Sequence, residues 1–254
     1  EFVRSGGALY ASCRSSSRDK TGGKPSDFLL ADVLGVSLAA EAEGRLNFLT
    51  PAEDSFKDML APQDYLIHEG IFMQIKLAGA EILATRTRPW FDPDKRNVSG
   101  GFSSIHSNPP GPRGTEPALT RNVFGKGTAV YSAMAFERVE EEINTHVLSA
   151  LMRSLLQRPP WFEAKAHPSV EITYFDQPEN ERVVLSVVVN QADLPNVPVD
   201  VTIRARIPNG ANPKDVVLLP DETLLNFRRA DGDYIEFDLR QVPVFAMVAV
   251  GYGV

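Results

Sequence analysis

Cys13 is the residue whose type and position first suggest nucleophilic chemistry. It is the only cysteine of the chain, and it follows the apolar run Ala8-Leu9-Tyr10-Ala11-Ser12, which has the length of a strand. A catalytic cysteine needs a histidine that holds it as a thiolate. The neighbours of Cys13 are not the glycines that a sharp nucleophile turn requires, and no His-x-Glu pair is found among His68, His106, His146 and His167. We therefore interpret Cys13 as a structural thiol.

Metal and cofactor chemistry has little support in the sequence. A single cysteine excludes an intrachain disulfide and a cysteine-based zinc site. Asp92, Asp94 and His106 lie in one proline-rich segment, but their spacing matches no known set of ligands. We predict no catalytic residue, no metal and no cofactor in this chain.

Sugar chemistry would need paired carboxylates, which the sequence does not reveal. Glycoside hydrolysis uses two carboxylates about 5–9.5 Å apart across a cleft. The acidic residues of the first half show no pattern that pairs any two of them. Trp90-Phe91 and Trp161-Phe162 could stack on sugar rings, but such aromatics are equally good anchors for a protein interface. We expect Trp161-Phe162 to pack at a domain junction.

The composition is that of a globular protein with two domains. The chain has 254 residues, with 43% hydrophobic and 23% charged residues. The net charge of -7 argues against a nucleic-acid partner, and no apolar run approaches the roughly 18 residues that span a membrane. These features indicate a soluble protein and leave the compartment open, with the cytoplasm slightly favoured. Glu1 to Gly7 resembles the last turn of a helix with a glycine cap, so we expect the chain to be a fragment.

The first 160 residues mix strand and helix patterns. A helix is predicted to start near Pro25-Ser26-Asp27 and to end at Gly35, and an amphipathic helix is predicted from about Val139 to Leu156. Gly125-Lys126-Gly127 predicts the turn of a hairpin. Strands are expected at Ala8–Ser12, Arg45–Leu49, Asp64–His68, Phe72–Lys76, Glu81–Arg86, Thr120–Phe124 and Thr128–Met134.

Beyond Trp161 the hydrophobic period becomes two. Val170, Ile172 and Tyr174 alternate with polar residues, and the same alternation runs from Val199 to Arg206. Turn signals such as Asn209-Gly210 and Asp231-Gly232 separate the runs. About seven short strands without a helix predict a small antiparallel β-sandwich.

The segment from Thr87 to Leu119 is too long for a simple connector. Its six prolines favour an extended shape, and it carries four large apolar residues, Trp90, Phe91, Phe102 and Ile105. We predict that these residues pack against another subunit or another part of a larger protein. The alternative is that the segment folds back on its own domain as a lid.

The order of several motifs resembles glycosidases. The chain contains FVRSGGALYAS, SDFLLADVLGV, AGAEILATRTRP, NVFGKGTAVYSA and VEEEINTHVLSAL, followed by VEITYFDQPENERVVLSVVVNQ, VTIRARIPNG, VVLLPDETLL and VPVFAMVAV. This series is similar to the amidotransferase-like trimerisation domain and the C-terminal β-sandwich of glycoside hydrolase family 42 beta-galactosidases. It is also similar to those parts of the related alpha-L-fucosidase-like glycosidases.

The resemblance implies the following expectations. Residues 1–160 form a flavodoxin-like α/β domain of the class I glutamine amidotransferase type, incomplete at its N-terminus, and residues 161–254 form an all-β antiparallel sandwich. The chain is the non-catalytic oligomerisation portion of a larger glycoside-hydrolase-like protein, whose catalytic (β/α)8 barrel lies elsewhere. Its partners are that barrel and further copies of itself. Two alternatives stay open: a degenerate amidotransferase or hydrolase that uses Cys13, and a carbohydrate-binding module.

Overall fold

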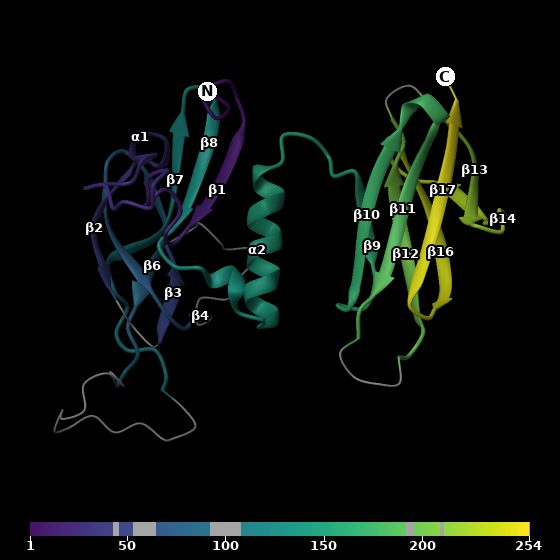
Figure 1. Ribbon diagram of the computed structural model, residues 1–254. Coiled ribbons are helices and arrows are strands. Elements are labelled where there is room, and N and C mark those ends of the chain that lie inside the picture. The colour runs from purple at the N-terminus through teal and green to yellow at the C-terminus, as the bar shows by residue number, and fades with distance from the viewer. Residues whose placement is uncertain (43–45, 53–64, 92–107, 192–195, 209–210, 254) are drawn as a thin grey trace. The chain divides into compact units, whose positions relative to one another are not determined.

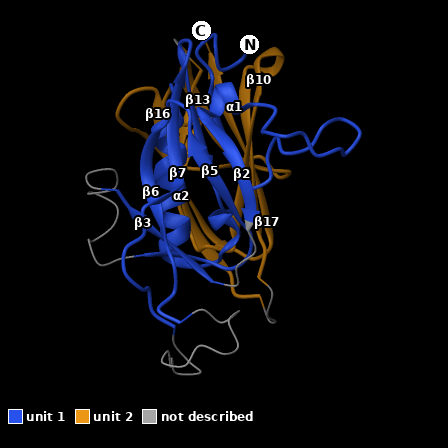
Figure 2. Ribbon diagram, turned by 90° about the vertical axis from the view of Figure 1, so that its left-hand side faces the viewer, with its two compact units in different colours: residues 1–157 blue, residues 158–254 orange. Residues whose placement is uncertain are grey.

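The chain forms two compact units in the computed structural model. The structure describes residues 1–254 except 43–45, 53–64, 92–107, 192–195, 209–210 and 254 (Figure 1). The first unit spans Glu1–Gln157 and the second Arg158–Val254 (Figure 2). Among the described residues, no helix has the length and the apolar character needed to cross a membrane.

A six-stranded sheet forms the centre of the first unit. Its strands follow the order β1 (Ala8–Ser12), β8 (Gly127–Ser132), β7 (Glu116–Phe124), β6 (Glu81–Thr87), β3 (Asn47–Pro51) and β4 (Leu66–His68). A separate antiparallel pair consists of β2 (Val36–Ala42) and β5 (Phe72–Leu77). The helical segments are α1 (Ala31–Leu34), the 3-10 turn η1 (Phe136–Arg138) and α2 (Glu142–Leu155).

Both faces of the six-stranded sheet are covered. Val130 and Tyr131 are consecutive on β8 and both are buried, although neighbouring side chains of a strand point to opposite faces. On one face, Tyr131 packs against Phe28, at 5.1 Å between ring centroids. On the other face lies α2, whose Val147 and Leu151 also belong to the core (Figure 1). The first unit therefore has three layers, with α2 on one side of the sheet and β2, β5 and α1 on the other (Figure 1).

The flavodoxin-like α/β fold of the amidotransferase type predicted for this unit is wrong. That fold needs a mainly parallel sheet with a helix in each crossover. Among the described strands, only β1 and β8 pair in parallel, and the neighbouring pairs of the same sheet are antiparallel. Short linkers explain the difference, because the two residues between β7 and β8 can close a hairpin but cannot hold a crossover helix.

The helix predicted up to Gly35 is also shorter than expected. Only Ala31–Leu34 are α-helical, and Gly35 ends the turn in the left-handed conformation at φ 66°. The second predicted helix is present as α2, with Val147 and Leu151 buried on its inner face. The first unit is therefore rich in β-structure, with one long helix among its described residues.

The second unit is a β-sandwich, as its alternating sequence predicts. One sheet has the order β10 (Val170–Gln177), β11 (Arg182–Val189), β17 (Phe245–Gly253), β13 (Asn212–Leu219) and β14 (Thr223–Leu224). The other has the order β15 (Phe227–Arg229), β16 (Tyr234–Val242), β12 (Val199–Arg206) and β9 (Phe162–Lys165). The 3-10 turn η2 (Pro178–Asn180) connects β10 to β11.

The inner faces of the two sheets form one core. Leu185 and Val248 of the five-stranded sheet and Ile203 and Ile235 of the four-stranded sheet belong to a single buried cluster. All four side chains are almost completely buried. Alternation along each strand turns the remaining side chains outward, so the character of the two outer faces depends on those residues.

Candidate functional site

Cys13 lies at the carboxyl end of β1, beside the carboxyl end of the parallel strand β8. Its backbone has φ 49°, a left-handed value that is uncommon for a residue other than glycine. The Cys13 N–H donates a 2.7 Å hydrogen bond to the carbonyl of Ser132, and the Cys13 carbonyl accepts a 2.6 Å bond from the Tyr131 hydroxyl. These two bonds to the end of β8 hold the turn in place.

A partly buried network on Glu137 lies at the same end of β1. The Tyr10 hydroxyl donates to Oε2 of Glu137 at 2.9 Å, and the Ser12 hydroxyl donates to Oε1. Burial, followed by the charge of Glu137, raises the pKa of Tyr10 above its ordinary value. The phenol therefore stays protonated and acts as a donor, so the network joins β1 to the turn η1.

The surroundings of Cys13 do not activate it as a nucleophile. Burial raises the pKa of the Cys13 thiol, so the thiol form predominates at neutral pH. Burial also lowers the pKa of His68, although the nearby Ile71 backbone and the charge of Glu137 oppose the shift. The structure shows no standard hydrogen bond between either ring nitrogen of His68 and any described residue. The Cys–His pair that thiol catalysis requires is therefore not formed within the described part of the chain.

A polar hollow of about 430 Å³ lies between β4 and the start of α2. It is lined by Ile67, His68, Glu69, Arg138, Val139 and Glu141. The two ring nitrogens of His68 are themselves inaccessible to solvent, so a molecule in the hollow could not reach them. Within the described residues, no three histidine, cysteine or acidic side chains gather closely enough to hold a metal ion. Asp92, Asp94 and His106, whose spacing matched no known set of ligands, lie outside the described residues.

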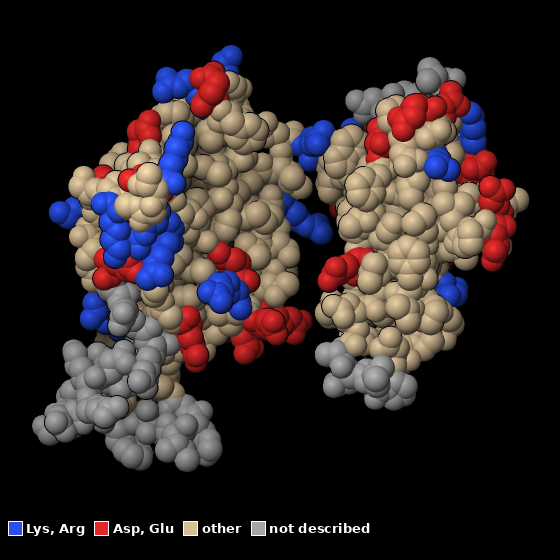
Figure 3. All heavy atoms as spheres, viewed as in Figure 1, with Lys and Arg blue, Asp and Glu red and all other residues tan. Residues whose placement is uncertain are grey.

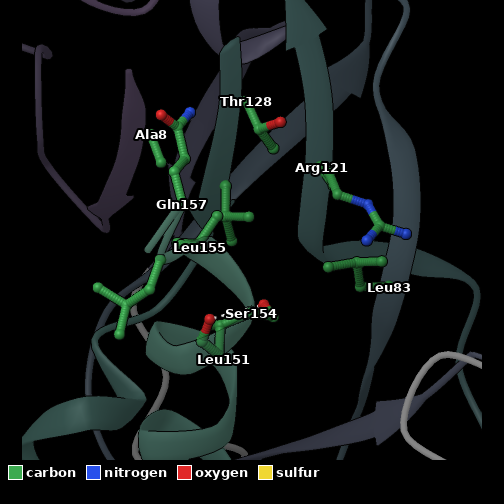
Figure 4. A pocket seen from close by; sticks show the side chains of 10 residues that line it. Ala8, Leu83, Arg121, Thr128, Leu151, Ser154, Leu155 and Gln157 are labelled. Carbon is green, nitrogen blue, oxygen red and sulfur yellow. Dashed lines mark hydrogen bonds between the residues drawn. The ribbon is translucent and has the colours of Figure 1, made fainter. Parts of the chain in front are cut away.

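A smaller pocket of about 160 Å³ lies where the end of α2 meets the sheet (Figure 4). Leu83, Val130 and Leu151 provide apolar walls, and the polar residues Arg121 and Gln157 also line the pocket. Arg121 is occupied by an ion pair of 3.1 Å with Glu81. Binding sites for small molecules usually measure about 300–1,000 Å³, so this pocket is too small for an oligosaccharide.

Trp90 lies at the start of the long segment and is exposed. Its side chain is 63% accessible to solvent. The Trp90 N–H donates to the Pro109 carbonyl at 2.8 Å, and the Phe91 N–H donates to Oδ1 of Asn108 at 3.0 Å. These bonds bring the two ends of the segment together. Of the other predicted interface residues, Phe102 and Ile105 lie outside the described residues.

The second tryptophan is anchored within its own unit. The Trp161 ring stacks on Tyr174 at 5.5 Å between centroids, and the guanidinium groups of Arg158 and Arg206 lie 4.5 Å and 5.5 Å from its centroid. A ring held in this way stabilises the start of the sandwich. Trp161 therefore does not offer free ring faces for stacking on a sugar.

The other aromatic residues of the sandwich differ in exposure. Phe237 is buried in the core, whereas Phe175 and Phe245 are 59% and 49% accessible. Both exposed phenylalanines belong to the five-stranded sheet. The alternating sequence pattern does not distinguish these two from the aromatic residues of the core. The strand register places both on the outward side of that sheet.

The comparisons with known proteins identify similar folds. No protein-family model matches the chain, and no curated protein matches it in sequence. Alpha-L-fucosidase isoenzyme 2 from Paenibacillus thiaminolyticus is similar in structure, with a TM-score of 0.70, 18% identity, and coverage of 98% of this chain and 37% of that chain.

Two beta-galactosidases are also similar in structure. The enzyme from Bacillus circulans sp. alkalophilus has a TM-score of 0.60 and 14% identity, and the match covers 98% of this chain and 30% of that chain. The cold-adapted enzyme from Rahnella sp. R3 has a TM-score of 0.58 and 17% identity, with 98% and 29% coverage. The chain thus spans little more than a third of these glycoside hydrolases at most, and at such identities the likeness concerns the fold alone.

Proposed function

We propose that this chain is a non-catalytic structural and assembly portion of a larger glycoside-hydrolase-like protein. The observation that carries the proposal is the difference in coverage. The match to the fucosidase covers 98% of this chain but only 37% of that enzyme. A fold that is shared in full and fills a minor part of a glycosidase is suited to support a catalytic domain located elsewhere. The motif order of the sequence, which resembles the region after a catalytic barrel, favours the same role.

The chemistry at the end of β1 supports a role without catalysis. The Cys13 thiol has a raised pKa and Glu137 is occupied by two hydroxyl donors. An acid–base pair for glycoside cleavage would need a second carboxylate facing the first across a cleft. Two acidic side chains, Glu69 and Glu141, line the hollow beside His68. Glu137 is not among the residues that line this hollow, so it does not face these two carboxylates across it.

Trp90 and Phe91 support the assembly role. An exposed tryptophan offers about 150–250 Å² of contact area, and burial of such a side chain stabilises an interface by roughly 1.5–3 kcal/mol. The hydrogen bonds from Trp90 to Pro109 and from Phe91 to Asn108 fix the base of the segment. A fixed base reduces the entropy lost on association. We propose that Trp90 and Phe91 contact another part or another copy of the larger protein.

The proposal is tested by activity and by mass. The chain is assayed on aryl alpha-L-fucosides and aryl beta-galactosides beside an active glycosidase, and we expect no turnover above background. Turnover that is abolished by Glu137→Gln or by Glu69→Gln would overturn the non-catalytic role. Trp90→Ser with Phe91→Ser in the larger protein should lower the mass measured by light scattering, and an unchanged mass would exclude these two residues from the interface.

A further inference from the structure

One cross-strand row of the sandwich is apolar across all five strands of its sheet. Phe175 of β10 pairs with Val184 of β11, and Val184 pairs with Ala249 of β17. Ala249 pairs with Val217 of β13, and Val217 pairs with Leu224 of β14. Residues in register across a sheet point to the same side. Because the neighbours Leu185 and Val248 point into the core, this row points outward.

The next rows extend the apolar surface and then end it. The adjacent row contains Thr173, Ser186, Met247 and Leu219, and the row after it contains Glu171, Val188 and Phe245. At the opposite border lies a polar row, where Nε of Arg182 donates to Gln177 at 2.7 Å. We call the outward side the apolar face, defined by Phe175, Val184, Val188, Val217, Leu219, Leu224, Phe245, Met247 and Ala249. Its apolar centre and polar borders match the usual anatomy of a protein interface.

The other outer face of the same sandwich shows what a solvated face looks like. Glu163, Arg204, Glu236 and Arg228 follow one another across the four-stranded sheet. Arg204 forms an ion pair of 2.6 Å with Glu163, and Arg228 pairs with Glu236. The apolar face has no such pairs. In Figure 3 the surface over β10, β11 and β17 is largely free of charged residues.

The exposure on the apolar face is large enough for a stable contact. Leu224, Phe175, Phe245 and Val188 are 73%, 59%, 49% and 38% accessible. Val184 and Ala249, which lie between Phe175 and Leu224 in the row, are themselves buried at 8% and 4%, so the accessible apolar area comes mainly from the four residues just named. An area of a few hundred Å² is about the size of the largest patch that monomers usually carry. A standard interface buries about 800 Å² on each partner, of which somewhat more than half is apolar. The apolar face therefore supplies the apolar share of one complete interface.

We infer that the apolar face pairs with the apolar face of a second copy of this chain, sheet against sheet. The two-fold axis would run parallel to β17, midway between the two sheets. It would place Ala249 against its own copy, Val184 against Val217, and Phe175 against Leu224. Each large side chain at one edge then meets the other edge of the partner, as an isologous interface requires. Packed sheets lie about 10 Å apart, a distance that the large side chains at the two edges of the face can span.

Charge limits this pairing but does not forbid it. The net charge of -7 opposes the association of two copies. The residues that define the apolar face are uncharged, so they add no like-charge repulsion at the contact itself. A sugar-binding face would need several polar donors and acceptors. The polar side chains of the three rows are those of Thr173, Ser186 and Glu171, and they lie on β10 and β11 only. This inference names a partner for the proposed assembly role and rests on that role.

Sedimentation velocity of the full chain over a wide range of concentration tests the inference. We expect a reversible dimer, and we expect Phe175→Ser with Leu224→Ser to weaken it by at least about tenfold, since each substitution removes more than about 1.4 kcal/mol of burial. Val123→Ser is the matched control, because Val123 is 74% accessible and belongs to the first unit. A chain that is monomeric at every concentration, or a dimer that the double variant leaves intact, would overturn the inference.

A disulfide test reports the register without relying on affinity. In a Cys13→Ser background, a chain with Phe175→Cys is mixed with a chain with Leu224→Cys under mild oxidation. The proposed axis predicts rapid formation of the mixed covalent dimer and little of it with Val123→Cys as one partner. Oligosaccharide binding by a monomer that Phe175→Ser abolishes would assign the face to sugar and overturn the inference. Such a result would leave the non-catalytic proposal standing, because that proposal fails only through turnover.

Discussion

The hydroxyl of Tyr10 lies 2.9 Å from Oε2 of Glu137 and donates a hydrogen bond to it across 127 positions of the chain. Ser12, two residues further along β1, donates to the other carboxylate oxygen. The carboxylate thus fastens the first strand of the sheet to the turn that follows β8.

Removal of this donor should therefore reduce stability. Tyr10→Phe leaves the ring in place but leaves the partly buried carboxylate of Glu137 with one donor fewer. Hydrogen bonds to charged groups contribute about 1.5–3 kcal/mol, so we expect a loss of that size in the free energy of unfolding by urea. Tyr65→Phe is the control, because the Tyr65 ring packs on Phe48 and its hydroxyl has no hydrogen bond with a described residue. Equal losses in both variants would show that the Glu137 contact does not stabilise the fold.

Cys13 should react slowly. Burial raises the pKa of its thiol, so the thiolate that attacks iodoacetamide is scarce at pH 6 to 7. We expect alkylation of the folded chain to be slower than that of the same chain unfolded in urea, as followed by mass spectrometry. A folded chain that is alkylated faster than the unfolded one would mean that the thiol is activated, and the hydrolase alternative would regain support.

Local patterns predict the sandwich better than the first unit. The alternation of Val170, Ile172 and Tyr174 identifies β10, because one face of an antiparallel strand is buried. The strand β2 is missed because Val36–Ala42 contains alanine and glutamate, which favour helices. Pairing with β5 overrides that preference. The flavodoxin-like prediction fails for a different reason: it rests on motif order, whereas the two residues between β7 and β8 can only close a hairpin.

The candidate site could be predicted only in part. Cys13 is recognisable because it follows an apolar strand, and the sequence also indicates that it lacks an activating histidine. Glu137 and Tyr10 carry no local signal, because their contact depends on the pairing of β1 with β8. Trp90 and Phe91 remain predicted interface residues. The apolar face was missed because alternation alone does not show that Phe175 and Phe245 share one outer surface.

The two tryptophans should respond differently to substitution. Trp161→Ala removes a stack on Tyr174 and two arginine contacts, so we expect a loss of about 2–4 kcal/mol in unfolding free energy. Trp90→Ala should change stability by less than about 0.5 kcal/mol, because the ring is largely exposed. Urea titrations followed by circular dichroism measure both values. A large loss for Trp90→Ala would show that the segment packs on its own unit as a lid.

Alkaline pH should weaken the sandwich through Tyr252. Its hydroxyl donates a 2.8 Å hydrogen bond to Asp176, joining β17 to the end of β10. Burial and then the hydrogen bond to Asp176 raise the pKa of Tyr252 from 10.0 to about 12. A raised pKa means that the folded state holds the proton more tightly than the unfolded state, so this contribution is complete below pH 10 and is lost as the pH rises toward 12.

The wild-type chain should therefore lose unfolding free energy more steeply than Tyr252→Phe over this range. Urea titrations at matched pH values give the difference between the two chains, which cancels the contributions of the other buried tyrosines. Parallel curves for the two chains would show that Tyr252 titrates alike in the folded and unfolded states.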